Sequence, residues 1–396
     1  MMIQQRQPSR TRRVLFGLAT LCLPLVAFCL LYLGTALYRS HGLYHYFKNH
    51  PRGWKGSVHR PDPLLGYAPV PNARGFHILP IGEPIPMRYG EHGFRVPLHD
   101  PPEQRLRRPI VLALGCSFTY GDAVVAESAY AYRVGAALHG TTLNAGVCGY
   151  GLGQMLVLAQ KLIPANHPDY VLVQYSPWLA DRSATLYAPA FFGRVPVPYF
   201  YAAPDGFALH PPVFQTVATD LPAYEFRSSP VSLHDRISFF RRLALPLYVH
   251  DDFNALRCRL AMLAGFIPPP ATAKEKMTEF VYRKIAAAAE ANHTRVVIVV
   301  LPSSYGPLHF PLVPLPRRAL VVNARDALLD RLVASPPADS GAPVPMSASA
   351  LEALYRQHYA LWRGSPPQLV DPHPNEAAHR IIAEQIVAAI LADETH

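Results

Sequence analysis

Residues 109–122 read Pro-Ile-Val-Leu-Ala-Leu-Gly-Cys-Ser-Phe-Thr-Tyr-Gly-Asp, and this stretch decides the fold. Its apolar run, residues 110–114, is rich in branched side chains, which is typical of a strand buried on both faces of a parallel sheet. Ser117 follows that strand, and a helical pattern covers about residues 127–138. Because open α/β sheets bind ligands beyond the carboxyl ends of their strands, Ser117 is a candidate site residue. A helix-capping role is the alternative for such a serine.

Two later stretches carry glycines and further polar residues. Residues 142–153 read Thr-Leu-Asn-Ala-Gly-Val-Cys-Gly-Tyr-Gly-Leu-Gly, which is a short strand that breaks into glycines. Residues 371–379 read Asp-Pro-His-Pro-Asn-Glu-Ala-Ala-His and lead into a helical run. An unassisted serine hydroxyl is a weak nucleophile that requires a base and a group to orient the base. His373 is the candidate base, and Asp371 is the carboxylate nearest to it in the sequence.

In this order, the three stretches resemble the SGNH (GDSL-like) hydrolase family in its membrane-anchored bacterial form. The resemblance covers about residues 106–190 and 275–392. It implies that Ser117 is the nucleophile and that an acyl-enzyme forms on it. It also implies that the backbone N–H groups of Ser117 and Gly149 stabilise the oxyanion of the tetrahedral intermediate. Cys116 is the less attractive nucleophile, because the matched motif places the serine one residue later.

Two positions depart from the family pattern. The family spaces its pair as Asp-x-x-His, whereas here Asp371 stands two residues before His373 and Val370 takes the aligned position. A changed turn, a Ser-His dyad and a triad completed by another carboxylate all remain open. The family's oxyanion asparagine is also missing, and ungapped alignment puts Trp178 there. The indole N–H is a donor, so Trp178 is either a third oxyanion donor or a packing residue.

Strand and helix patterns alternate through the second half of the chain, which predicts an α/β fold with a parallel sheet covered on both sides. We expect a three-layer αβα sandwich of the SGNH/flavodoxin-like type over residues 106–396, with an insertion at about 182–270. Residues 39–105 are rich in Pro, Gly and aromatics and predict an extension of short strands and turns packed on this domain. The expected strands are 110–114, 142–147, 170–175 and 295–301, and the expected helices include 154–163, 232–263 and 277–292.

The amino-terminal part contains a long uncharged segment. Residues 14–38 form a run of 25 residues without charge, long enough to cross a bilayer as one transmembrane helix. Residues 1–13 contain four arginines, which favours a cytoplasmic N-terminus. We therefore expect a single-pass protein of the bacterial inner membrane with its catalytic domain in the periplasm or cell exterior. A signal peptide cleaved after Gly34-Thr-Ala36 is the alternative.

Composition limits the partners. The chain has 37 Lys and Arg against 27 Asp and Glu, a formal net charge of +10, which favours anionic membranes or polymers. It lacks both a basic cluster interleaved with aromatics and a nucleic-acid motif, which argues against nucleic-acid binding. No cysteine spacing indicates zinc or a redox pair, so we predict no cofactor and no metal. Cys116 and Cys148 are predicted to be buried small side chains.

Several other polar residues receive structural roles. His379 falls on the final helix and is predicted to be structural, and Asn144 and Asp122 are predicted to stabilise loops. Tyr199 and Tyr201 lie in the Pro-rich part of the insertion, where aromatics either fasten the loop to the core or stack on sugar rings.

These expectations converge on a serine-dependent ester hydrolase or O-acyltransferase. The resemblance favours an acetyl ester of an envelope or exported polysaccharide as the substrate. The alternative, from a different class, is a catalytically silent envelope scaffold that keeps the fold and binds a polymer or a protein partner.

Overall fold

The computed structural model describes residues 10–49, 54–55, 58–77, 79, 81–99, 106–190, 193–213, 232–302, 307–334 and 347–395. The chain divides into two compact units. The first comprises Met1–His50 with Glu225–Leu256, and the second comprises Pro51–Tyr224 with Arg257–His396. The expected insertion, residues 182–270, is therefore divided between the two units, because its residues 225–256 belong to the same unit as the amino-terminal segment.

Five parallel strands form the core of the second unit. They are β7 (Ile110–Leu114), β8 (Thr141–Asn144), β9 (Tyr170–Tyr175), β14 (Arg295–Val300) and β15 (Leu320–Val322), in the spatial order β8-β7-β9-β14-β15. All five residues of β7 are buried, as the uninterrupted apolar run predicts. Numbered along the chain, the order is 2-1-3-4-5, the flavodoxin-like arrangement. The order reverses beside β7, so the residues that follow β7 lie at the switch point where such sheets bind ligands.

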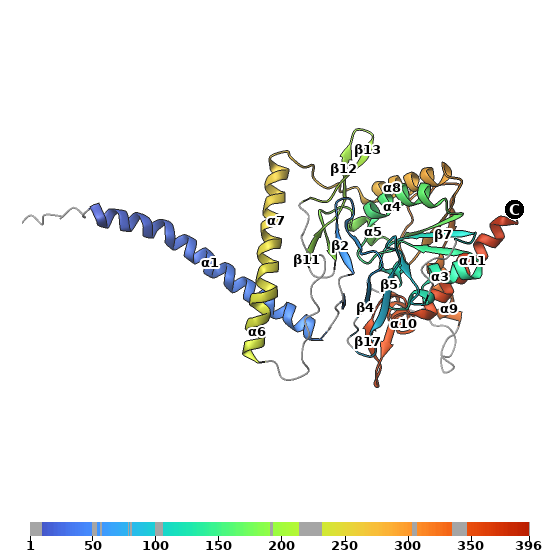
Figure 1. Ribbon diagram of the computed structural model, residues 1–396, viewed down its shortest axis with the longest axis horizontal. Coiled ribbons are helices and arrows are strands. Elements are labelled where there is room, and N and C mark those ends of the chain that lie inside the picture. The colour runs from blue at the N-terminus through green and yellow to red at the C-terminus, as the bar shows by residue number, and fades with distance from the viewer. Residues whose placement is uncertain are drawn as a thin grey trace, which may run out of the picture. The chain divides into compact units, whose positions relative to one another are not determined.

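Helices cover both faces of this sheet. On one face α4 (Leu152–Asn166) packs on α8 (Lys274–Glu290), and on the other α11 (Glu376–Glu394) packs on α3 (Tyr130–Ala137) and α9 (Ala324–Ala334) (Figure 1). The mixed α/β fold with a mostly parallel central sheet is thus confirmed. The strand expected at 142–147 is shorter than predicted, and so is the helix expected at 127–138. At the start of the expected helix, Ala126–Ser128 form a 3-10 turn. Ala129 is extended and separates this turn from α3.

The extension contributes more than packing, because its strands continue the central sheet. β1 (Trp54–Lys55), β4 (Arg74–His77), β5 (Ile85–Tyr89) and β6 (Arg95–Val96) pair antiparallel, and Arg95 of β6 pairs with Asn144 of β8. The result is one nine-stranded sheet with a parallel half and an antiparallel half. β5 alternates between buried and half-buried positions, which is typical of a strand with one face on the core.

Short elements complete the second unit. A hairpin of β12 (Tyr199–Ala203) and β13 (Gly206–His210) lies in the insertion, where Tyr199 is buried and donates a hydrogen bond to the Pro268 carbonyl (2.8 Å). This contact fits the role of fastening the loop. The other elements are β2 (His59–Asp62), β3 (Gly66–Pro69), α2 (Ser117–Tyr120), α5 (Trp178–Asp181), β10 (Tyr187–Ala190), β11 (Gly193–Pro196), α10 (Ala348–Tyr359), β16 (Leu361–Arg363) and β17 (Gln368–Asp371).

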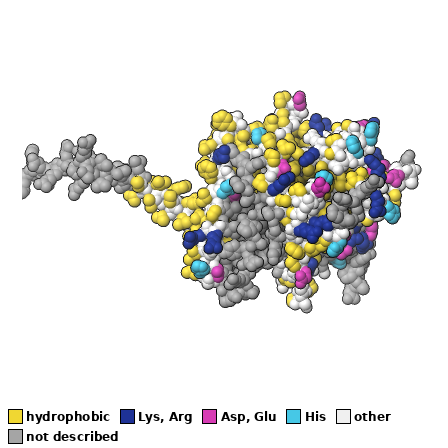
Figure 2. Space-filling model, in the orientation of Figure 1, with side chains coloured by type: hydrophobic (Ala, Val, Ile, Leu, Met, Phe, Trp, Pro, Cys, Tyr) yellow, Lys and Arg dark blue, Asp and Glu magenta, His cyan; other side chains and the backbone are white. Residues whose placement is uncertain are grey.

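The first unit consists of helices. They are α1 (Arg10–Asn49), α6 (Leu233–Phe239), the π-helical turn η2 (Phe240–Ala244) and the first part of α7 (Leu245–Leu263). Within α1, Cys22–His41 is long and apolar enough to cross a membrane by length and composition, a test that a signal sequence also passes. Hydrophobic side chains cover the described part of α1 (Figure 2). Residues 1–9 of the expected cytoplasmic N-terminus lie outside the described residues.

Candidate active site

The nucleophile candidate stands on a tightly fixed turn. Ser117 is the first residue of α2, directly after β7, Gly115 and Cys116. A Cβ at Gly115 would lie 2.0 Å from Thr119 Oγ1 and 2.6 Å from Gln174 Oε1, so only glycine fits there. Gln174 Oε1, from the neighbouring strand β9, accepts hydrogen bonds from Cys116 N (3.0 Å) and Thr119 Oγ1 (2.9 Å). The two central strands therefore fix the position from which the Ser117 side chain projects.

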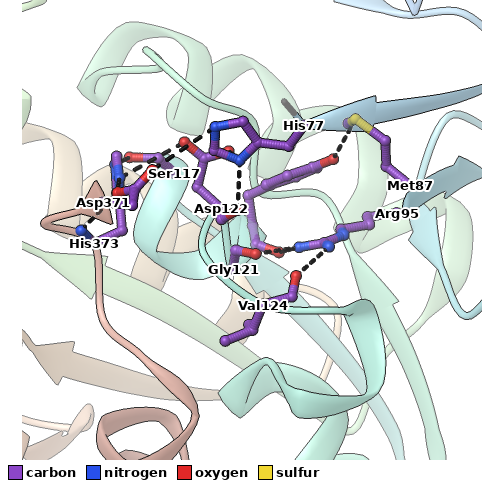
Figure 3. A network of polar contacts seen from close by, with 10 residues as sticks. His77, Met87, Arg95, Ser117, Gly121, Asp122, Val124, Asp371 and His373 are labelled. Atoms are coloured by element: carbon purple, nitrogen blue, oxygen red, sulfur yellow. Dashed lines mark hydrogen bonds and ion pairs between the residues drawn. The ribbon is translucent and has the colours of Figure 1, made fainter. Parts of the chain in front are cut away.

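Ser117, His373 and Asp371 lie in one hydrogen-bonded chain (Figure 3). Ser117 Oγ is 2.9 Å from His373 Nε2, and His373 Nδ1 is 2.6 Å from Asp371 Oδ1. Ser117 and Asp371 are 4% and 0% exposed, so the hydroxyl and the carboxylate are both shielded from bulk water. The structure thus brings together three residues that span more than 250 positions of the chain.

The turn after β17 explains how the short Asp-x-His spacing works. Asp371 Oδ1 accepts a second hydrogen bond, from the backbone N–H of His373 at 2.9 Å. One carboxylate oxygen therefore holds both the backbone and the imidazole of the residue two positions later. Of the three arrangements left open by the sequence, the structure has the changed turn, with Asp371 against the imidazole.

Charge at this site favours a protonated imidazole. Burial lowers the pKa of His373, but the charge of Asp371 and its hydrogen bond, followed by the charge of Asp122, outweigh burial and raise the pKa to about 9. At neutral pH the ring of the free protein therefore mostly carries two protons. Its Nε2 atom becomes an acceptor for the serine proton as the pH rises toward 9.

The two backbone donors expected for an oxyanion are the amides of Ser117 and Gly149. Across the described part of the chain, neither the Ser117 nor the Gly149 amide donates a hydrogen bond. Gly149 has φ 83°, the left-handed region that favours glycine, and it is half-buried. Their role in binding an oxyanion stays a prediction.

Trp178 lies beside the site on α5. The centroid of its ring is 5.2 Å from that of Phe118, and the Phe118 centroid is 5.3 Å from that of the His373 ring. Burial raises the pKa of the neighbouring Cys116 thiol, but the charge of Arg182 and the hydrogen bond from Gln174 Nε2 (3.2 Å) help to lower it overall. A third oxyanion donor at Trp178 remains a prediction, and packing accounts for the contacts seen.

Sequence reasoning missed His77. This side chain comes from β4 of the extension, where its Nδ1 lies 2.8 Å from the backbone oxygen of Asp122 and its Nε2 lies 3.7 Å from Asp371 Oδ2. Asp122 Oδ2 is 3.7 Å from His373 Nδ1, so Asp122, which was expected to stabilise a loop, also acts electrostatically on the imidazole. Nothing in the local sequence around His77 indicates this, because only the joined sheet brings β4 to the site.

Arg95 is a second residue of the extension that serves the site. It is 1% exposed and donates hydrogen bonds to the backbone oxygens of Tyr120 (2.6 Å), Gly121 and Val124 (2.6 Å). These carbonyls belong to the loop that follows the nucleophile, so Arg95 fixes the loop that carries Asp122. The Pro, Gly and aromatic content of residues 39–105 predicted a packed extension but indicated no target for the guanidinium.

The remaining polar candidates have the structural contacts expected of them. His379 Nδ1 accepts a hydrogen bond from the Tyr130 N–H (3.2 Å), and its ring stacks on that of Tyr130. Burial, with the nearby cations, lowers the pKa of His379 to about 3. Asn144 binds the Thr119 carbonyl (3.0 Å) and accepts from the Gly146 N–H (3.0 Å). Cys116 and Cys148 are buried free thiols, as predicted.

A single group of side chains among the described residues has the composition of a cation site. One ligand atom from each of His77, Asp122 and Asp371 lies within 4.8 Å of the others. Asp371 is committed to His373 through its other oxygen, and His77 to the Asp122 carbonyl. This group therefore belongs to the hydrogen-bonded network of the site.

Comparisons with known proteins give only distant similarities. No family model matches the sequence, and no curated protein matches it. Solved structures similar to this chain include an acetylxylan esterase from Geobacillus stearothermophilus, in a catalytic mutant form (12% identity, 73% of this chain and 96% of that chain, TM-score 0.32). Another is a member of the lipolytic protein G-D-S-L family from Veillonella parvula (10% identity, 70% of this chain and 96% of that chain, TM-score 0.30). A third is an alpha/beta hydrolase from the metagenome of Lake Arreo (12% identity, 72% of this chain and 96% of that chain, TM-score 0.32). Identities and TM-scores this low assign no activity.

Proposed function

We propose that the protein is a serine-dependent ester hydrolase or O-acyltransferase that uses Ser117, His373 and Asp371. The observation that supports this proposal is the unbroken chain of contacts from Ser117 Oγ through both imidazole nitrogens to Asp371. A buried serine that only caps a helix has no need of an imidazole on its hydroxyl and a carboxylate behind that imidazole.

In the proposed reaction, His373 Nε2 takes the proton of Ser117 while Oγ attacks the ester carbonyl. Asp371 holds the imidazole in the required orientation and stabilises the imidazolium that forms. The negative oxygen of the tetrahedral intermediate binds to the amides of Ser117 and Gly149. His373 then gives its proton to the leaving alcohol. Water or an acceptor hydroxyl then gives its proton to His373 and attacks the acyl-enzyme. The bond between the acyl group and Ser117 Oγ breaks, and Oγ takes the proton back from His373.

Location and substrate are part of the proposal. With α1 as an uncleaved membrane anchor, the second unit faces the periplasm or the cell exterior, where polysaccharides carrying acetyl esters are available as substrates. The formal net charge of +10 suits anionic polymers and membrane surfaces. Hydrolysis and transfer share one acyl-enzyme and differ only in whether water or a sugar hydroxyl receives the acyl group.

Covalent labelling tests the nucleophile directly. The purified full-length protein is treated with a fluorophosphonate, and labelling is compared between the wild type, Ser117→Ala and the neighbouring variant Cys116→Ala. Labelling of the wild type and Cys116→Ala, with none of Ser117→Ala, is expected. If the wild type is not labelled while a known serine esterase is, the alternative of a catalytically silent scaffold is favoured.

Trp178→Phe tests the third oxyanion donor, because phenylalanine retains the ring contact with Phe118 and removes the N–H. If the indole binds the oxyanion, kcat falls by about 10²-fold or more at unchanged KM. An unchanged kcat assigns Trp178 to packing.

A further inference from the structure

The helical unit contains a polar contact between α1 and α7. Asp252 Oδ2 of α7 accepts hydrogen bonds from Tyr32 Oη (3.0 Å) and Arg39 Nη1 (2.8 Å) of α1. The Arg39 guanidinium also lies 4.1 Å from the centroid of the Tyr248 ring. Between Tyr32 and Arg39, the small residue Ala36 is only 1% exposed, although its neighbours on α1 are largely exposed. α1 and the start of the inserted helices therefore form a specific helix pair.

The position of this contact along α1 is informative. Arg39 lies near the carboxyl end of the apolar segment Cys22–His41, and Tyr32 lies seven residues earlier, roughly 10 Å along a helix. α7 therefore meets α1 over the last part of the apolar segment. If α1 spans a bilayer, this is the depth at which the helix leaves the hydrocarbon and enters the headgroup region.

α7 presents an apolar stripe to its surroundings at this level. Val249, Phe253 and Leu256 are 49%, 63% and 55% exposed, and their spacing of four and three residues places them on one face of the helix. Leu233 and Ile237 of α6 are similarly exposed, at 73% and 49%. Exposed apolar residues spaced along one helix face indicate a surface that binds a partner or a membrane.

We propose that this α7 stripe lies in the lipid surface beside the point where α1 leaves the bilayer, as an interfacial helix. Only 6% of the apolar segment Cys22–His41, against which α7 packs, is buried within the protein, so the α7 stripe belongs to a helix that lies beside an exposed apolar helix. Arg241 and Arg242 of η2 are exposed cations, which suit anionic headgroups, and apolar residues with flanking arginines are typical of interfacial helices. This proposal goes beyond the ester chemistry and rests on α1 being the membrane segment.

Tryptophan substitutions in the full-length protein test the proposal. The variants Phe253→Trp and Leu256→Trp are reconstituted into phosphatidylethanolamine and phosphatidylglycerol vesicles that contain doxyl-labelled lipid. Leu30→Trp, on the exposed surface of α1, reports whether α1 is in lipid, and Arg283→Trp, on an exposed position of α8, reports a site outside the helical unit. Emission of the wild type is subtracted, and circular dichroism checks that each variant folds.

We expect doxyl-labelled lipid to quench the tryptophan emission at positions 30, 253 and 256, and aqueous acrylamide to quench it little there. At position 283 we expect no quenching by doxyl lipid. Lipid quenching at position 30 without quenching at 253 and 256 overturns the proposal. In that case acrylamide distinguishes a stripe open to water, which is quenched, from one covered by a second copy or another protein, which is protected. Absence of quenching at position 30 overturns both the anchor and the stripe, and leaves the labelling of Ser117 unaffected.

Discussion

The two halves of the nine-stranded sheet contribute differently to the site. Ser117, the proposed nucleophile, follows β7 of the parallel half, whereas Asp371 and His373, the proposed orienting group and base, come from β17 of a separate hairpin and the turn after it. The antiparallel half supplies His77 and Arg95, which contact Asp371 or the loop after the nucleophile. The parallel half therefore carries the proposed nucleophile, the β16–β17 hairpin carries the proposed base and its partner, and the antiparallel half positions them.

This difference shows that the extension is part of the site and not only a linker between α1 and the parallel sheet. His77 and Arg95 are buried, and a polar side chain is buried only where hydrogen bonds or charges compensate for lost hydration. Both find these partners in the nucleophile loop or in Asp371. If the division of roles is right, loss of His373 or Asp371 nearly abolishes turnover, and losses in the antiparallel half weaken it.

His373→Ala has the largest expected effect. Without a base on Ser117, kcat for an activated ester falls by about 10⁴-fold, and the thermal unfolding midpoint also falls because the buried Asp371 carboxylate loses its partner. Steady-state kinetics measure the loss, and circular dichroism is the control for folding. Turnover at the wild-type rate would assign the base to another residue.

Asp371→Asn is expected to lower kcat by about 10³-fold and to change the pH profile. The Asp371 charge and hydrogen bond raise the pKa of His373 to about 9, so wild-type kcat/KM rises with pH until about 9 and is then level. Removing that charge lowers the His373 pKa, so the rise of the residual activity moves to lower pH. A profile of unchanged midpoint would contradict the assignment of Asp371 as the partner of His373.

Arg95→Met tests the support given by the antiparallel half. Methionine fills part of the volume but removes the guanidinium donor from three buried carbonyls. Gly121 O keeps the Val124 N–H (3.2 Å) and Tyr120 O keeps Asn144 Nδ2 (3.5 Å), so we expect a total destabilisation of about 1–3 kcal/mol. We expect a lower unfolding midpoint in urea together with a moderate loss of kcat, since the nucleophile loop loosens. Arg88→Met is the matched control, because Arg88 lies in the same half and donates to the Leu98 carbonyl, away from the site. Equal effects of both variants would show that Arg95 supports only the general stability of the fold.

His77→Gln has the smallest expected effect, roughly tenfold in kcat/KM, because His77 acts through Asp122 and Asp371 and touches no reacting atom. Glutamine keeps a hydrogen-bond donor, so His77→Phe should lose more activity than His77→Gln. If His77 positions Asp122 and Asp371, the pH profile of kcat/KM shifts as well, whereas a packing role predicts no shift. His59→Phe is the control, since His59 is a buried histidine of the same extension that packs on Tyr67 and Tyr89. A pH profile that is identical in the wild type and both His77 variants would reduce His77 to a packing residue.

Much of the parallel half was predictable because its signals are local. β7 and β9 have the predicted bounds, since an apolar run of branched residues has few alternatives to a buried strand. The pairing of Ser117 with His373 was predictable only through the motif resemblance, since 256 positions separate them. The antiparallel half was recognised as short strands and turns, but its short segments carry no signal for the strand they pair with, so His77 escaped detection.

The sequence by itself determined which segments are buried strands and helices, and which residue types stand at the ends of the strands, because hydrophobic periodicity and glycine placement act over a few residues. The tertiary structure alone decided that Asp371, two residues before His373, still reaches the imidazole, because the turn between them brings the carboxylate to the ring. It also decided that a histidine from the extension meets two carboxylates there. Such contacts depend on how distant strands register in one sheet, and that register is set by the packing of the whole core.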